Sequence, residues 1–317
     1  MARVLTVVLF VAVTLAVSAK TRDYKAELEK LQKNYNNLKK EVKELRATIS
    51  LKKLEKKNEK KTKTKAEAYL KTLWNGPSKG QPYTIPGLGM KLVYVAPGSF
   101  KMGLDNGDSD EKPVHRVTLS KGYWIGKYEV TQLEYQSIMK TNPSYFKGSN
   151  KPVETVSWND AVKFCQKLTA RERAAGRLPS HCEYRLPTEA EWEFAARAGT
   201  KSRGYKYSGS DSIDSVAWYG SNLGTHEVGT KSSNELGLYD MSGNVCEWCF
   251  DDWHSNYNGA PSNGGRWGDG TGSDRVFRGG SWPYNARYCR VANRYLSSPG
   301  RRGSNMGFRL VLASSSL

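Results

Sequence analysis

The sequence predicts an α+β domain preceded by a long helix. Three capping boxes, in which a Ser or Thr caps the first turn of a helix and an acid three residues later caps back, begin at Thr131, Ser157 and Thr188. Short segments with strand character flank these positions, and Gly- and Ser-rich loops connect them. The sequence has no recognisable repeat period. Helices set among short strands and long loops are typical of an α+β fold.

The N-terminus has the features of a secretory signal peptide. Arg3 is followed by an apolar run over residues 4–17 and then by Ser18 and Ala19. The run is short for a membrane span, and no Cys for lipid attachment lies near the cleavage point. We therefore expect residues 1–19 to be removed and the mature chain to be exported, to the periplasm, the cell surface or the medium.

Residues 20–65 are predicted to form a basic coiled-coil helix. Apolar side chains recur at alternating spacings of four and three between Tyr24 and Ile49, with no Pro or Gly among them. This pattern favours a homo-oligomer, and the alternative is a monomeric amphipathic helix. The segment holds 17 Lys and Arg against 7 Asp and Glu, in a chain of net charge +18. Such an excess favours a solvated face or contact with an anionic envelope surface over nucleic-acid binding.

Pro and Gly residues between 77 and 89 predict a linker, which we place at residues 66–87, and a globular domain at 88–317. The expected elements are a strand at 91–95, a turn at 97–98, a strand near 100–102, a surface loop at 103–113, strand character at 114–128, the three capped helices, and a loop-rich stretch after Gly199.

The segment from Pro283 to Asn305 has a biased composition. It contains no Lys, Glu, Gln, Met or Trp, although these five types make up 69 of the 317 residues of the chain. It keeps Tyr, Arg, Asn, Ser and Gly, which are common in adaptable binding surfaces. Both flanks, 276–282 and 306–311, alternate as half-buried strands do. The segment is therefore a candidate binding surface, and the alternative is a turn-rich loop at a sheet edge.

Four motifs carry a resemblance to a known family. They read YRLPTEAEWE at 184–193, GLYDMSGNVCEW at 237–248, RGGSW at 278–282 and GFR at 307–309. Over residues 88–313 the chain is similar to the formylglycine-generating enzyme (sulfatase-modifying factor) family. The resemblance implies a C-type-lectin-like fold.

The same resemblance argues against the family's oxidase activity. Those enzymes oxidise a Cys of client sulfatases with a copper-binding Cys pair that follows the Gly-Gly-Ser motif. Here Tyr284 stands where the first Cys of the pair would be, and Cys289 matches a family position outside the pair. Because Tyr cannot replace a thiolate ligand, we expect neither copper nor oxidase activity. Cys246 and Cys249 form a C-x-x-C motif that is interpreted as two buried thiols, with a redox or metal site as the alternative.

The resemblance also implies a structural calcium site. Family members bind calcium through a side chain, backbone carbonyls and an acid in the stretch that corresponds to Asp240, Gly243, Val245 and Glu247. Carboxylate and carbonyl oxygens are the ligands that calcium prefers. In the alternative interpretation, the two acids only hydrogen-bond the loop.

One branch of the family consists of variable proteins diversified by retroelements, in which mutagenesis of AAY codons never produces Lys, Glu, Gln, Met or Trp. These are the five types missing from 283–305, and the motifs RGGSW, CRVANR and GFR also resemble that branch. The resemblance implies an exported, non-catalytic protein of receptor or adhesin type that binds a protein or glycan ligand at a cell or host surface. The alternatives are a non-catalytic member with a fixed ligand and an oxidase. We expect the diversified side chains to form an exposed patch that hardly affects folding; they are Pro283, Tyr284, Asn285, Arg287, Tyr288, Tyr295, Leu296, Ser297, Gly303, Ser304 and Asn305.

Overall fold

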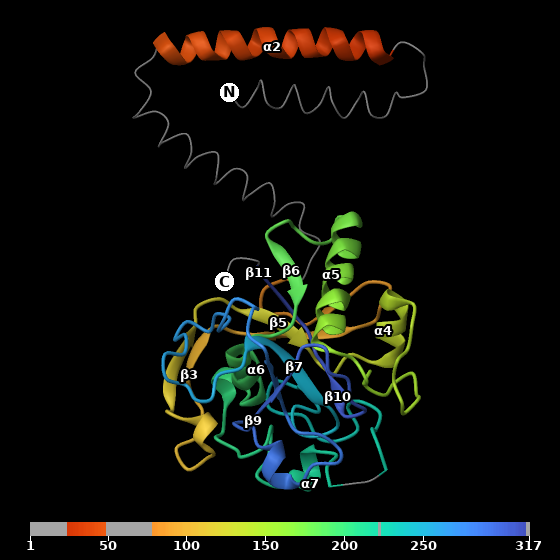
Figure 1. Cartoon of the computed structure of the whole chain (residues 1–317), viewed down its shortest axis with the longest axis vertical. Helices are drawn as coiled ribbons and strands as arrows, with labels where there is room; N and C mark the ends of the chain where they lie inside the picture. Colours follow the sequence, from red (N-terminus) through yellow and green to blue (C-terminus); the bar gives the residue numbers. More distant parts are fainter. Residues whose placement is uncertain (1–23, 49–77, 221–222, 315–317) are drawn as a thin grey trace. The chain divides into compact units, whose positions relative to one another are not determined.

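The computed structural model describes residues 24–48, 78–220 and 223–314. The chain divides into two compact units, residues 1–71 and 72–317, which we treat separately (Figure 1). The predicted signal peptide lies outside the described residues. Within the described ranges, no helix combines the length and apolar character needed to cross a membrane.

The first unit contains helix α2, Tyr24–Thr48. The predicted basic helix covers this range, and the remainder of 20–65 lies outside the described residues. Two side chains of the predicted seam, Tyr35 and Leu38, are 50% and 37% exposed in the single chain. Apolar side chains at heptad spacing remain exposed unless another helix covers them.

We expect this seam to drive self-association. A chain of residues 20–317 should sediment as an oligomer and a chain of residues 78–317 as a monomer, because only the longer chain contains α2. Replacing Leu31 and Leu38 with Lys in the longer chain should give the monomer mass. Equal masses for the two chains would contradict the prediction.

The described part of the second unit contains three sheets, and the last described strand has an interior position in the first of them. This sheet has the antiparallel order β1-β2-β5-β11-β6. Its strands are β1 Tyr83–Thr84, β2 Lys91–Val95, β5 Tyr123–Gly126, β11 Val311–Ser314 and β6 Cys182–Arg185.

The second sheet has the order β10-β7-β8-β9, in which β10 and β7 are parallel and the other pairs antiparallel. Its strands are β10 Met306–Gly307, β7 Cys246–Asp252, β8 Arg275–Arg278 and β9 Arg294–Ser297. A separate hairpin joins β3 Gly98–Met102 to β4 His115–Leu119.

The three predicted capping boxes are confirmed. Thr131, Ser157 and Thr188 each accept a hydrogen bond from the N3 amide, and the N3 acid caps back. The helices of this unit are α4 Gln132–Met139, α5 Trp158–Ala174, α6 Glu189–Ala196 and the short α7 Ile213–Val216, with 3₁₀ turns η1 Ser109–Glu111, η2 Gly199–Lys201 and η3 Ala286–Cys289.

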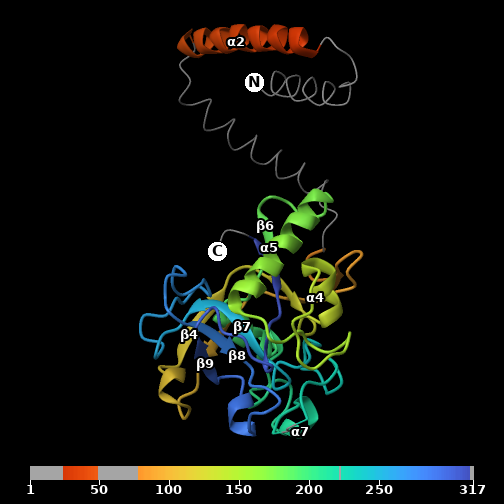
Figure 2. The ribbon, with the colours of Figure 1, turned by 45° about the vertical axis from the view of Figure 1, so that its right-hand side comes forward.

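Helices α5 and α6 differ in burial. Helix α5 packs one face against β6 and leaves the other in solvent (Figure 2). All eight residues of α6 are buried, including its acids Glu189, Glu191 and Glu193. Buried carboxylates need charged or hydrogen-bonding partners, and α6 obtains these from the C-terminal strands described below.

Two sequence predictions about element boundaries were wrong. The predicted linker 66–87 includes β1 and Ile85, whose fully buried side chain packs in the core with Met90 and Leu92, so the folded domain begins before residue 88. The predicted half-buried strand at 276–282 is β8, which ends at Arg278 and is buried on both faces. The prediction of a half-buried strand failed because helix α6 covers the face of β8 that the alternating pattern assigned to solvent.

Candidate binding surface

The compositionally biased segment 283–305 connects β8 to β10 and runs through η3 and β9. In Figure 1 the blue helical turn η3 lies beside α7, at the end of the domain remote from the free end of α5. The amide of Gly220 donates to the carbonyl of Tyr284 over 2.8 Å, which ties the segment to the loop that follows α7.

Exposure divides this segment into two classes. The fixed motif residues 289–294 are all buried. Among the positions predicted to vary, Pro283, Asn285, Arg287, Tyr288 and Leu296 are exposed, and Tyr284, Tyr295, Gly303, Ser304 and Asn305 are half-buried. Ser297 is the exception because it is only 8% exposed, in β9 opposite Arg275, and it adds little to a surface.

Three tyrosines form a compact cluster on this surface. The ring centroids of Tyr284, Tyr288 and Tyr295 lie 5.4–6.1 Å apart. Tyr295 also stacks on Phe277 at 5.0 Å, and burial raises the pKa of both the Tyr284 and the Tyr295 hydroxyls. The expectation that all variable side chains are dispensable for folding is therefore wrong for Tyr284 and Tyr295, because both pack against the main core.

Buried arginines anchor the chain just before the segment and in its middle. Arg278, in the RGGSW motif, pairs with Glu189 and Glu193 of α6 and donates to the carbonyls of Val291 and Ala292 over 2.9 and 3.1 Å. Arg294 binds Glu189 through two contacts of 2.6 and 2.9 Å. The arginine side chains are fully buried, so α6 supplies the charges that position the segment.

Two more buried pairs complete this arrangement. Arg290 contacts both carboxylate oxygens of Glu111 in η1 at 2.6 and 2.7 Å. Arg309, in the C-terminal GFR motif, contacts both oxygens of Glu247 in β7 at 2.6 Å. We call Arg278, Arg290, Arg294 and Arg309 the frame arginines.

Arg287 makes a different kind of ion pair. It contacts Asp108 of the acidic loop, with side chains that are 63% and 35% exposed. Exposed pairs of this kind contribute little to stability because water and salt screen them. Position 287 can therefore change without loss of the fold.

The residues of the predicted calcium site lie close together, and the structure adds a third acid to them. The Asp240 Oδ2 atom accepts from the Gly229 amide at 2.7 Å, whereas its Oδ1 atom is buried without a hydrogen-bond partner. Burial raises the pKa of Asp240 to about 6. Glu247 is already paired with Arg309 and accepts from Trp192 Nε1 at 2.7 Å.

The added acid is Glu129, which the sequence analysis did not single out. Its carboxylate accepts from the Val245 amide at 2.9 Å and from Asn244 Nδ2 at 2.6 Å. Burial, Asp240 and Glu247 raise the pKa of Glu129. The only sequence signal was an acid between Tyr128 and Val130, at the end of a predicted strand.

The fit of a cation to this group depends on Asp240. A cation there would coordinate the Oδ1 atom of Asp240, which has no hydrogen-bond partner. It would also offset the negative charge of the neighbouring carboxylates, of which Glu247 is already neutralised by Arg309. Within the described ranges, no three His, Cys, Asp or Glu side chains are arranged as a metal site, so the carbonyls of Gly243 and Val245 would have to contribute.

The C-x-x-C motif consists of two buried thiols, as predicted. Cys246 and Cys249 are both inaccessible to solvent and not disulfide-bonded. Burial raises the pKa of both thiols, which disfavours the reactive thiolate. Cys289 is also buried and free, directly beneath the variable surface.

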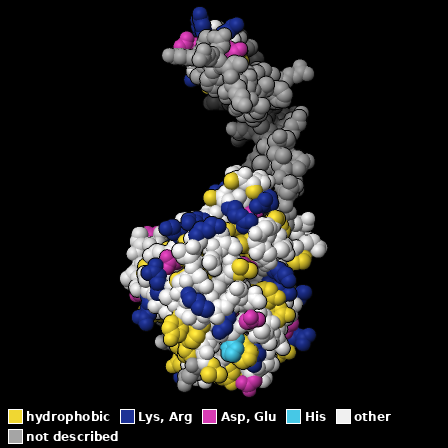
Figure 3. All heavy atoms as spheres, turned by 90° about the vertical axis from the view of Figure 1, so that its right-hand side faces the viewer, with side chains coloured by type: hydrophobic (Ala, Val, Ile, Leu, Met, Phe, Trp, Pro, Cys, Tyr) yellow, Lys and Arg dark blue, Asp and Glu magenta, His cyan; other side chains and the backbone are white. Residues whose placement is uncertain are grey.

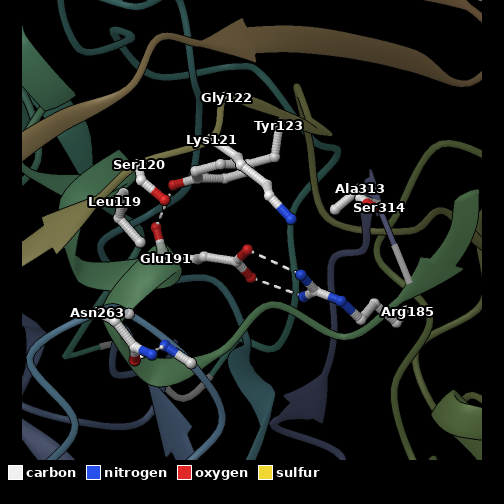
Figure 4. Close-up of a pocket in the computed structure, with 12 residues that line it drawn as sticks. Leu119, Ser120, Lys121, Gly122, Tyr123, Arg185, Glu191, Asn263, Ala313 and Ser314 are labelled. Carbon is white, nitrogen blue, oxygen red and sulfur yellow. Dashed lines mark hydrogen bonds and ion pairs between the residues drawn. The ribbon is translucent and has the colours of Figure 1, made fainter. Parts of the chain in front are cut away.

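A small cavity of about 140 Å³ lies elsewhere, at an edge of the first sheet (Figure 4). Lys121 extends toward its centre, where Arg185 and Glu191 form a two-contact pair at 2.7 and 2.8 Å. Glu191 also accepts from the Thr188 amide, so this pair stabilises the start of α6. None of the residues that line the cavity belongs to 283–305.

Residues 86–314 match the model of the sulfatase-modifying factor enzyme 1-like domain. The chain belongs to this family. Its domain therefore has the C-type-lectin-like fold of the formylglycine-generating type, with the helices and sheets described above.

Several proteins are similar to this chain in sequence. The chain is 35% identical to chaperone protein LppX of Paenibacillus barcinonensis over 264 residues, covering 69% of this chain and 88% of LppX. It is 37% identical to the formylglycine-generating enzyme of Streptomyces coelicolor over 179 residues and spans about half of each chain, at 50% and 52%.

Among solved structures, Treponema denticola variable protein 1 superposes with a TM-score of 0.63 at 34% identity, covering 73% of this chain and 98% of that protein. PvdO from Pseudomonas aeruginosa superposes with a TM-score of 0.64 at 30% identity, covering 74% and 99%.

The frame arginines and the exposed variable positions should differ sharply in their effect on stability. Arg294→Ala leaves Glu189 buried without its main partner and should cost about 3–5 kcal/mol of unfolding free energy. Arg287→Ala should change it by no more than about 0.5 kcal/mol. Urea denaturation of the two variants measures this difference. Similar midpoints for both variants would contradict the distinction.

Proposed function

We propose that this protein is an exported, non-catalytic binding protein that displays a diversified surface on a rigid lectin-like scaffold. One observation carries the proposal. Within the segment that lacks five residue types, the fixed residues 289–294 are buried, and ten of the eleven predicted variable positions are exposed or half-buried. This distribution of burial is expected of a scaffold whose sequence varies mainly at positions that are open to solvent. The relationship to Treponema denticola variable protein 1 supports the same interpretation.

The chemistry of the surface suits recognition of a protein or glycan at a cell or host surface. Tyrosine and arginine commonly supply the dominant contacts in binding interfaces. Here Tyr288 and Arg287 are exposed beside the half-buried Tyr284 and Tyr295. Tyr side chains provide a large contact area and lose little conformational entropy on binding. A different set of Tyr positions would therefore select a different ligand.

The alternatives make different predictions. A retroelement-diversified protein requires a near-copy of the coding region for 276–310, rich in AAY codons, beside a reverse transcriptase gene. A member with a fixed ligand would lack this copy. An oxidase that used Cys246 and Cys249 would consume oxygen with a Cys peptide in the presence of copper, and the burial of both thiols weighs against that activity.

The helix α2 has a supporting role in this proposal. Oligomerisation through its seam would place several binding surfaces on one particle and increase avidity without new contacts. Its lysines suit contact with an anionic envelope surface.

The variable surface can be tested with ligands selected on the protein itself. Peptides from a random phage-displayed library, and glycans from an array, are selected on the full chain. Replacing Asn285, Arg287, Tyr288 and Leu296 together with Ala should abolish their binding and leave the melting temperature nearly unchanged. The matched control replaces Lys101, Arg116 and Leu133, which are exposed outside the segment. Undiminished binding by the first variant would overturn the proposal.

We also propose that calcium stabilises the fold through Asp240, Gly243, Val245 and Glu247, with Glu129 beside them. A chelator should lower the melting temperature, because a ligand that binds only the folded state stabilises it by mass action. Asp240→Asn should remove this response. Asp240 is a better test position than Glu247, whose substitution would also break the pair with Arg309. An unchanged melting temperature in chelator would refute the calcium site.

A further inference from the structure

The exposed apolar residues outside the variable segment point to a second component of the binding surface. Leu223 and Tyr145 are the most exposed large apolar side chains in the described part of the chain, at 82% and 74%. Contiguous exposed apolar patches on soluble proteins commonly mark interaction sites. Figure 3 shows hydrophobic side chains gathered on the lower part of one face of the domain.

Tyr145 and Gly224, the residue after Leu223, both contact one ring, that of Phe146. Tyr145 and Trp282 approach this ring edge-on, with centroids 4.9 and 5.3 Å from it. A Cβ atom added to Gly224 would lie 2.5 Å from the Phe146 ring, so the loop that carries Leu223 contacts the same ring. We call Tyr145, Phe146, Leu223 and Trp282 the constant patch.

Part-buried hydrogen bonds anchor residues close to Tyr145 and Leu223 in the sequence. The Phe146 amide donates to Glu154 at 2.7 Å, and its carbonyl accepts from Gln132 at 2.8 Å. The amide of His226, three residues after Leu223, donates to Asn244 at 3.0 Å. The exposure of Tyr145 is therefore imposed by an ordered loop, which reduces the entropy that binding would cost.

The constant patch is continuous with the variable surface. Trp282 directly precedes Pro283, and its Nε1 atom donates to the carbonyl of Ser304 over 3.2 Å. Gly220, in the loop that leads to Leu223, donates to the carbonyl of Tyr284. Tyr145, Phe146 and Leu223 lie outside the segment of biased composition, and Trp282 belongs to the fixed RGGSW motif. The proposed diversification would therefore leave these four side chains unchanged while their neighbours vary.

We propose that the constant patch binds an apolar segment of a protein ligand, the same ligand that the variable surface recognises. This inference rests on the proposed function and narrows its ligand class to proteins. Leu223 is 82% exposed, and its aliphatic side chain has no hydrogen-bonding group for a sugar hydroxyl. A protruding Leu suits contact with aliphatic or aromatic side chains.

Charges around the patch indicate acidic residues in the ligand segment. Lys147 follows Phe146, the Lys151 ammonium lies 5.9 Å from the Phe146 ring centroid, and Lys231 lies 4.2 Å from that of Trp218. Trp218 in turn stacks on His226 at 3.6 Å. Within residues 220–231, Glu227 is the acid that opposes these lysines. A ligand segment with apolar residues and flanking acids would complement this surface.

The test uses the peptides selected from the random phage-displayed library on the full chain. Tyr145→Ser and Leu223→Ser should each weaken peptide binding at least about tenfold, as expected for truncated interface anchors. Leu133→Ser is the matched control, because Leu133 is 55% exposed on α4. It should leave affinity unchanged. All three variants should melt like the unmodified chain, since exposed substitutions change stability by only about 0.5 kcal/mol. Selected peptides should be rich in apolar residues and acids.

The outcomes separate this inference from the proposed function. If only the variant at Asn285, Arg287, Tyr288 and Leu296 loses binding, the variable surface acts alone and the constant patch is refuted. If only Tyr145→Ser and Leu223→Ser lose binding, the variable surface has no role and the proposed function fails. Selection of glycans without peptides would overturn the protein class of ligand.

Discussion

The pairing of buried arginines with buried carboxylates is the interaction on which the binding surface depends. A guanidinium or carboxylate removed from water is costly unless its charge and hydrogen-bonding groups are matched. Glu189 of the fully buried α6 pairs with Arg278 and Arg294. Glu193 of the same helix pairs with Arg278 and Arg197, so both acids are matched by guanidinium groups that in turn need them. The planar guanidinium fixes direction as well as distance through paired contacts. The chain before the segment, at Arg278, and its middle, at Arg294, are therefore positioned by groups that cannot be exchanged independently.

This arrangement suits a fold that accommodates many sequences at the same place, as the proposed function requires. Arg278 lies before the segment, Arg290 and Arg294 lie within it, and Arg309 follows it. Each has a carboxylate partner on an element outside the segment, in η1, α6 or β7. The side chains between them can change because the chain path is set by the frame arginines. The parallel pairing of β10 with β7 and the interior place of β11 then return the chain to the core.

The surface is not uniformly free to vary. Tyr284 and Tyr295 each present part of their surface to solvent and pack the remainder against the core. Substitutions at these two positions are expected to affect folding as well as the proposed recognition, whereas those at Arg287 and Tyr288 should act mainly on recognition. The constant patch is proposed as the opposite case, in which exposed side chains would keep their identity. A diversified receptor built in this way would combine general adhesion from fixed apolar groups with selectivity from variable ones.

The sequence by itself determined the local features of this protein. The capping boxes at Thr131, Ser157 and Thr188 were predictable because each cap involves groups within three residues of one another. The family motifs and the missing residue types located the candidate surface for the same reason, since both are readable along the chain. Tertiary structure alone decided which side chains are buried. Ile85, Ser297 and both faces of β8 are covered by elements distant in sequence, and the contact of Asp108 with Arg287 spans 179 residues. The proximity of Glu129 to Asp240 and the assembly of the constant patch around Phe146 have the same origin. Burial and charge pairing are properties of neighbours in space, and local sequence patterns do not specify those neighbours.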